Sequence, residues 1–260
     1  MFRKRSLGLA LFLSAAIGIL IPGGVHATAI ATSQISFSSL QIIPDSGTVV
    51  YLDSWTAEAF AQAQNSLGEL DNQFDFSVGG MAMANAIAMF AIGHADAGAV
   101  SLTGNASGSL NIAGSIDAQA ISIGRTTLFN SFMITGGSGP VDVDFSTDLT
   151  GLLHVFTDSF GQQAFADMNL SLQLDGDTVL FHHSELSVGP NSPSMTLPVA
   201  TTLNGMRTLT FDTSYFVLVE GELDPMGIHV VPEPSTGVLF LLGLCYVGWL
   251  ATKRRAGGKS

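Results

Sequence analysis

The strongest local fold signal in the chain is the segment Leu170-Ser171-Leu172-Gln173-Leu174-Asp175-Gly176-Asp177-Thr178-Val179-Leu180-Phe181. Apolar residues alternate with polar ones before the Asp-Gly pair, and an apolar run follows it. An Asp-Gly pair suits a two-residue turn, because both central residues of that turn need a positive φ. The segment therefore predicts a β-hairpin.

Shorter runs with the same alternation recur along the chain, and we expect each to form a strand. In one of them Phe74, Phe76 and Val78 alternate with Asp75 and Ser77, which is the pattern of a half-buried strand. The others are residues 34–43, with Ile35 and Phe37 on one face, and residues 48–52, 207–211 and 215–219. The last two runs predict a second pair of strands around residues 212–214.

Glycine and serine are frequent, charged residues are sparse, and no long stretch has a strong 3.6-residue period. These features favour an all-β, antiparallel, jelly-roll-like β-sandwich. Two segments are ambiguous. Residues 56–67 could form a helix capped by Ser54 or a strand, since alanines alternate from 57 to 63, whereas residues 81–92 favour a strand. Glycines recur irregularly from Gly98 to Gly124 and suggest short strands and turns.

The first residues have the order of a secretory signal peptide. Arg3-Lys4-Arg5 precedes an apolar run from Leu7 to Ile21, and a small residue, Ala27, follows at a suitable distance. We expect signal peptidase to cut between Ala27 and Thr28 after export through the Sec translocon. The predicted domains are then residues 1–27 (signal peptide), 28–230 (an acidic, β-rich exported domain) and 231–255 (a C-terminal signal).

The C-terminal signal has three consecutive parts. Residues 231–236 contain two prolines, which keep the backbone extended because each proline also restricts the residue before it. An apolar run at 237–252 predicts a transmembrane helix of about 25 Å, at the short limit for a bilayer. Lys253, Arg254 and Arg255 form a basic stop that favours the cytoplasmic side.

Pro232-Glu233-Pro234, the apolar run and the basic stop together resemble the PEP-CTERM sorting signal of Gram-negative bacteria, and the resemblance covers residues 231–260. The resemblance implies that an exosortase, a membrane protease-transpeptidase, recognises and removes the tail. It also implies association with exopolysaccharide and biofilm. From the residues alone, the alternative is an ordinary single-pass C-terminal anchor with a proline-rich linker.

The charges are distributed unevenly. Seven of the nine lysines and arginines lie in the two end segments, and residues 28–230 contain two arginines against twenty acids, a formal net charge of −18. Such a domain repels nucleic acid and anionic lipid, so we expect neither as a partner. The one cysteine, Cys245, lies in the C-terminal signal. The exported domain therefore lacks the residues needed for thiol or lysine chemistry, and we expect it not to be an enzyme.

Asp142, Asp144, Ser146 and Asp148 have the spacing of the first oxygen ligands of a calcium loop. The pattern then fails, because Thr147 and Leu153 occupy the positions of the turn glycine and the bidentate glutamate. Asp142, Asp144 and Asp148 are therefore weak candidates for calcium, and we expect no other cofactor. Solvated acids on an exposed strand are the simpler interpretation.

Three smaller groups could support chemistry. On a strand, His183 and Glu185 would share a face and His182 would point away, so a zinc site would need further ligands. His94 and Asp96 could form an oriented pair. Asp175 and Asp177 flank the turn glycine, and turn chemistry alone explains them, with a metal role as the alternative.

The leading hypothesis is thus a structural or adhesive protein, anchored briefly in the inner membrane by its C-terminal helix and then delivered to the cell surface or the extracellular matrix. A carbohydrate- or calcium-binding module is the alternative, followed by a surface hydrolase.

Overall fold

The computed structural model describes residues 27–114, 118–158 and 161–229, and within these ranges it contains strands and no helix. Ala27–Val230 forms one compact unit. All its strand pairs are antiparallel and its buried apolar side chains form a single core cluster, so the unit contains the interactions needed for its own fold. The predicted all-β, antiparallel sandwich is confirmed.

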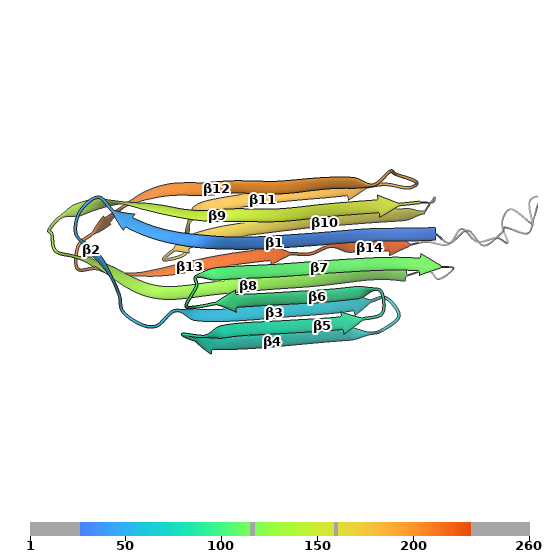
Figure 1. Ribbon diagram of the computed structural model, residues 1–260, viewed down its shortest axis with the longest axis horizontal. Helices are drawn as coiled ribbons and strands as arrows, with labels where there is room; N and C mark the ends of the chain where they lie inside the picture. Colours follow the sequence, from blue (N-terminus) through green and yellow to red (C-terminus); the bar gives the residue numbers. More distant parts are fainter. Residues whose placement is uncertain (1–26, 115–117, 159–160, 230–260) are drawn as a thin grey trace, which may run out of the picture. The chain divides into compact units, whose positions relative to one another are not determined.

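Two sheets make up the sandwich (Figure 1). The first contains, in spatial order, β12 (Met195–Thr210), β9 (Pro140–Thr157), β1 (Ala27–Pro44), β7 (Thr103–Gly114), β6 (Ala91–Gly98) and β5 (Met81–Ala88). The second contains β11 (Asp177–Val188), β10 (Gln162–Leu174), β13 (Ser214–Leu223), β8 (Ala118–Thr135), β3 (Thr56–Asn65) and β4 (Leu70–Val78). In this second sheet, β2 (Thr48–Tyr51) pairs with β8, and β14 (Met226–His229) pairs with both β8 and β10.

The predicted hairpin around the Asp-Gly pair is confirmed. Leu174 pairs with Asp177 across a two-residue turn. Asp175 and Gly176 both have positive φ values, 50° and 90°, as the turn requires. The Asp175 carboxylate also accepts a hydrogen bond of 2.8 Å from the backbone N–H of Phe216, which attaches the turn to β13.

The core differs between the two sides of the sandwich. Under β1, β9 and the C-terminal part of β8 it contains large side chains such as Phe37, Phe132 and Phe145, all fully buried. Between β3, β5 and β6 it consists mainly of alanines, namely Ala57, Ala59, Ala61, Ala63, Ala82, Ala84, Ala86, Ala91, Ala95 and Ala97. Small side chains let the two sheets approach closely here, so we call this side the thin half of the sandwich.

Glycines complete the thin half. The expectation of turns between Gly98 and Gly124 is wrong for its interior members, because Gly104 and Gly108 lie inside β7 and Gly124 lies inside β8. A Cβ on Gly124 would lie 2.8 Å from the His94 carbonyl oxygen, and one on Gly104 would lie 2.5 Å from the Thr126 hydroxyl oxygen on β8. These glycines are needed where one sheet lies directly against the other.

The ambiguous segments both form strands. Residues 56–65 are β3, because the buried alanines pack against the opposite sheet. The single strand expected over 81–92 is instead a hairpin, in which residues 81–88 are β5, residues 89–90 form the turn and β6 begins at Ala91. The predicted pairing of 207–211 with 215–219 is wrong, because β12 and β13 belong to different sheets and residues 211–213 connect them. Residues 226–229 form a further short strand, β14.

The strand prediction for 74–78 is confirmed, but its orientation is the reverse of what the alternation suggests. Phe74, Phe76 and Val78 are exposed. Asp71 and Asp75, on the opposite face of β4, reach the neighbouring edge strand β5 and accept hydrogen bonds from the backbone N–H groups of Ile87 (2.9 Å) and Met83 (3.0 Å). The acids thereby bond the exposed edge of β5, a position where unpaired N–H groups would invite another strand.

The predicted signal peptide and C-terminal signal lie outside the described residues. Within the residues that the structure describes, no helix is long and apolar enough to cross a membrane.

Candidate functional site

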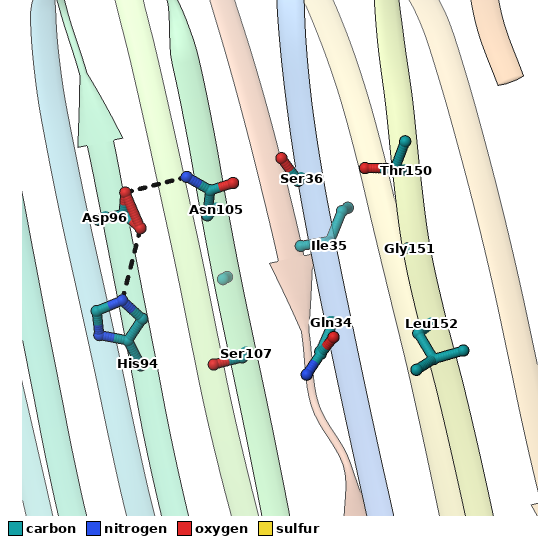
Figure 2. A pocket seen from close by; sticks show the side chains of 11 residues that line it. Gln34, Ile35, Ser36, His94, Asp96, Asn105, Ser107, Thr150, Gly151 and Leu152 are labelled. Carbon is teal, nitrogen blue, oxygen red and sulfur yellow. Dashed lines mark hydrogen bonds and ion pairs between the residues drawn. The ribbon is translucent and has the colours of Figure 1, made fainter. Parts of the chain in front are cut away.

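A polar hollow of about 390 Å³ lies on the outer face of the first sheet (Figure 2). Its lining comes from four adjacent strands, β6, β7, β1 and β9. The side chains at its surface are those of Gln34, Ser36, His94, Asp96, Asn105, Ser107, Thr150 and Leu152. The buried residues between them on the same strands, such as Ile35 and Ala106, point into the core.

Strand register arranges these side chains in two rows. One row crosses the sheet from Asp96 through Asn105 and Ser36 to Thr150. The other crosses it from His94 through Ser107 and Gln34 to Leu152. Three strand spacings separate β6 from β9, so each row is about 14 Å long.

The hollow forms around the one small residue in the middle of each row, which lies beside a longer amide side chain, Asn105 or Gln34. Ser36 and Ser107 are small, and they lie between the longer side chains of His94 and Asp96 on β6 and the Leu152 side chain on β9. The floor of the hollow thus presents hydroxyl and amide groups, while its β9 side adds apolar contact surface.

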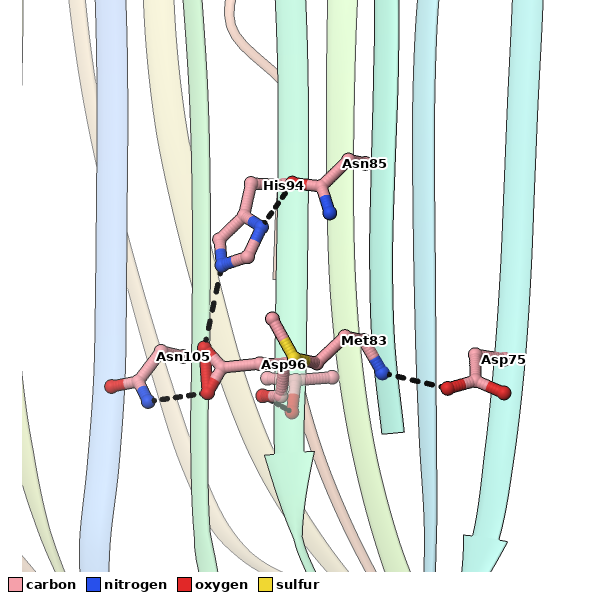
Figure 3. Close-up of polar contacts among 7 residues, drawn as sticks. Asp75, Met83, Asn85, His94, Asp96 and Asn105 are labelled. Atoms are coloured by element: carbon pink, nitrogen blue, oxygen red, sulfur yellow. Dashed lines mark hydrogen bonds and ion pairs between the residues drawn. The ribbon is translucent and has the colours of Figure 1, made fainter. Parts of the chain in front are cut away.

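Hydrogen bonds hold the polar side of the hollow in place (Figure 3). Asp96 accepts a hydrogen bond of 3.0 Å from the Asn105 amide, and its other oxygen lies 3.5 Å from His94 Nε2. His94 Nδ1 lies 2.7 Å from the Asn85 side-chain oxygen. Both ring nitrogens therefore contact residues other than serine, so this arrangement does not resemble an activated serine nucleophile.

The three calcium candidates lie on β9, and none of them lines the hollow, although Asp148 is only two residues from Thr150. Asp142 accepts a hydrogen bond of 2.6 Å from the Thr208 hydroxyl, and Asp148 accepts one of 2.7 Å from the Thr202 hydroxyl. Among the described residues, no three His, Cys, Asp or Glu side chains converge as a metal site requires. Asp142, Asp144 and Asp148 are spread along one strand, and any calcium binding by them stays a prediction.

The histidine pair has the predicted geometry on β11. His183 Nε2 lies 3.6 Å from the Glu185 carboxylate, and His183 Nδ1 lies 2.6 Å from the Asn169 side-chain oxygen. His182 instead contacts Ser184 at 2.8 Å.

Sequence reasoning missed an acidic group on the outer face of the second sheet. Asp167 and Asp224 lie side by side, and the Asp224 N–H donates to the Asp167 carboxylate at 2.9 Å. Burial first, and then the charges of Asp167 and Glu222, raise the pKa of Asp224 to about 6. Burial also raises the pKa values of Asp167 and Glu220. The residues come from β10 and β13 and the segment after it, so only the strand order brings them together.

Two solved structures have a remote likeness to this chain. The crystal structure of the protein YhaK from Escherichia coli has 7% identity and a TM-score of 0.12, with 76% of this chain and 87% of that chain covered. A GH31 alpha-xylosidase from Xanthomonas citri has 6% identity and a TM-score of 0.10, with 66% of this chain and 38% of the enzyme covered. TM-scores this low carry no argument about fold or function, and no curated protein matches the chain.

A family model gives a specific result for the C-terminal signal. It describes the PEP-CTERM protein-sorting motif, and it matches residues 230–255. This range contains Pro232, Glu233, Pro234 and the three basic residues, so the resemblance found in the sequence is confirmed for this segment. Such a motif implies export, membrane anchoring through the C-terminal segment and processing by an exosortase. The chain therefore carries a PEP-CTERM protein-sorting motif in residues 230–255.

Proposed function

We propose that this chain is a structural component of the extracellular polysaccharide matrix, which its β-sandwich contacts through the polar hollow. The sorting motif at residues 230–255 is the observation that carries the proposal, since it directs the sandwich to the cell surface. An exported domain with a formal charge of −18 and no lysine is well suited to a hydrated, extracellular environment. We expect it to act without catalysis.

The hollow supports contact with a glycan. Sugars present many hydroxyl groups, and a site for them needs oriented donors and acceptors of the kind that Asp96, Asn105 and Gln34 supply. The hydrogen bonds among His94, Asp96 and Asn105 fix these side chains before binding, which lowers the entropic cost of association. Leu152 offers an apolar surface for the C–H groups of a sugar ring.

The charge of the site selects the class of glycan. The hollow contains one carboxylate, Asp96, and no lysine or arginine among its lining residues. The net charge of the domain repels polyanions. We therefore infer a neutral polysaccharide, and not one rich in uronic acid or sulfate.

Affinity electrophoresis in gels that contain neutral polysaccharides would test the proposal. Residues 28–230 should be retarded, and the substitution Asp96→Ala should abolish most of the retardation. Asp148→Ala is a matched control, because it removes one carboxylate from the same outer face outside the hollow. The proposal is wrong if no neutral glycan retards the protein, or if the two variants behave alike.

Processing of the tail has its own test, by mass spectrometry of the mature protein. We expect loss of the residues after the motif, and retention of an uncleaved form when Pro232 and Pro234 are changed to Ala. A mature protein that still ends at Ser260 would contradict processing at this signal.

A further inference from the structure

The outer face of β4 exposes a continuous set of large apolar side chains. Leu70, Phe74, Phe76 and Val78 are 56, 59, 61 and 63% exposed, and the remaining outward residue, Asn72, is uncharged. We call Leu70, Phe74, Phe76 and Val78 the β4 face. A strand normally directs its apolar residues to the core, so this reversed orientation needs an explanation.

The apolar side chains of β4 face outward because the acidic side chains on its opposite face are hydrogen-bonded to β5. Asp71 and Asp75 bond the N–H groups of β5, and Glu69, just before β4, bonds the N–H of Met89 at 2.6 Å. Because alternate residues point to opposite faces, this use of the acids fixes the apolar set on the outside. No segment in the described part of the chain covers the β4 face, since all four of its side chains are more than half exposed.

The area of the β4 face is the amount that a dimer needs. At about 150–250 Å² for a whole aromatic side chain and somewhat less for Leu and Val, the four exposed fractions add up to about 400 Å². A standard interface buries about 800 Å² per partner, of which about 56% is apolar, or about 450 Å². The uncharged Gln62 and Gln64, which pair with Asn72 and Leu70, would supply part of the polar rim.

The acidic residues of the outer face lie far from β4, and this distribution limits which partner can bind the β4 face. On the same outer face, the acids Asp167, Glu185, Glu220 and Glu222 lie on β10, β11 and β13, while β4 is at the opposite end of the strand order. Arg125 on β8 lies between the two regions, with its guanidinium 5.4 Å from the Phe60 ring centroid. Glu58 is the one charged residue among the outward positions of β3.

A second copy of this chain offers an apolar face of the same area and can bind while the acidic strands of the two copies stay apart. If a two-fold axis runs parallel to β4 between the two copies, the two β4 faces meet, and the acidic strands of each copy extend away in opposite directions. This arrangement buries both β4 faces and keeps the electrostatic repulsion between two domains of formal charge −18 small. We propose that the sandwich forms a symmetric dimer through its β4 faces.

Sedimentation velocity of residues 28–230 tests this proposal, since that unit contains all the described strand pairs. The wild type should dimerise at or below about 100 µM, and Phe74→Ser with Phe76→Ser should weaken dimerisation about tenfold or more. Phe181→Ser is the matched control, because Phe181 is 63% exposed on β11, the edge strand at the other end of the sheet. A protein that stays monomeric at that concentration, or a control that dissociates the dimer equally, would overturn the proposal.

Cross-linking gives a second readout. Residues 28–230 contain no cysteine, so Phe74→Cys introduces a single thiol at the centre of β4. Near a two-fold axis it should form a disulfide-linked dimer, whereas Phe181→Cys should not. Flotation with phosphatidylcholine vesicles tests whether the β4 face binds a lipid surface instead of a second copy. If the wild type is monomeric and binds vesicles through Phe74 and Phe76, the β4 face contacts lipid and the dimer proposal is wrong.

Discussion

Gly93 provides the sharpest test of how the thin half is built. It lies on β6 and faces the second sheet, and a Cβ there would lie 2.8 Å from two backbone oxygens, those of Gln62 on β3 and Ile123 on β8. Ordinary contact begins at 3.4 Å, so both oxygens would have to retreat by 0.6 Å. Both belong to hydrogen-bonded strands that cannot rotate away as a flexible side chain does.

The cost of Gly93→Ala follows from these contacts. Overpacking of a dense interior typically costs about 1–3 kcal/mol. Replacing a glycine that can adopt the alanine conformation gains about 0.5–1 kcal/mol, because the unfolded chain loses freedom. Gly189→Ala is the control, since a Cβ at Gly189 meets no atom within 4 Å. The gain through the unfolded chain is common to both variants and cancels, so their free energies of unfolding should differ by about 1–3 kcal/mol.

Urea unfolding followed by circular dichroism measures this difference. We expect the midpoint for Gly93→Ala to fall and that for Gly189→Ala to stay or rise, with unchanged m-values. If Gly93→Ala is as stable as Gly189→Ala, the sheets do not approach as closely as described.

Three further predictions concern the acids. Because the folded pKa of Asp224, about 6, exceeds its ordinary value of 3.8, the folded state binds more protons between these values, and stability should fall as pH rises from 3.8 to 6. Asp224→Asn should remove that loss, with a gain of about 1 kcal/mol at pH 7 after allowance for solvent screening, while Asp177→Asn should not. Asp71→Ala should speed hydrogen exchange of the Ile87 amide and leave Met83 unchanged, and Asp75→Ala should do the reverse, because each carboxylate bonds one amide. Calcium at millimolar concentration should leave the melting temperature unchanged relative to a sample with chelator. Asp142 and Asp148 already accept hydrogen bonds from threonine hydroxyls, and no three acids converge in the described residues. A rise in the melting temperature with calcium would instead support calcium binding.

The sequence was sufficient to predict an element whose conformation depends on neighbouring residues alone. The hairpin at Asp175-Gly176 could be predicted from the apolar alternation and from a residue pair that tolerates positive φ values. The structure has both the hairpin pairing and the two positive φ values. The strand at 56–65 could not be distinguished from a helix in the same way. Alanine suits a helix intrinsically, and it forms a strand here because the opposite sheet leaves room only for a methyl group.

The hollow was not predictable from spacing along the chain. His94 and Asp96 are two residues apart, and their side chains share a face for that reason alone. Thr150 and Ser36 join them only because β9, β1, β7 and β6 are neighbours with a particular register. The same is true of Asp167 and Asp224, whose proximity depends on the pairing of β10 with β13 and β14.

The two proposals depend on opposite faces of the sandwich. The hollow lies on the outer face of the first sheet, and the β4 face is on the outer face of the second, because residues that alternate with buried alanines point away from the shared core. A dimer joined through the β4 faces would therefore leave both hollows open and directed outward. Two sites on one particle bind a long polymer far more tightly than a short oligomer, by their effective concentration. Loss of the β4 face should accordingly weaken binding to polysaccharide and leave binding to a short oligosaccharide unchanged, whereas Asp96→Ala should weaken both.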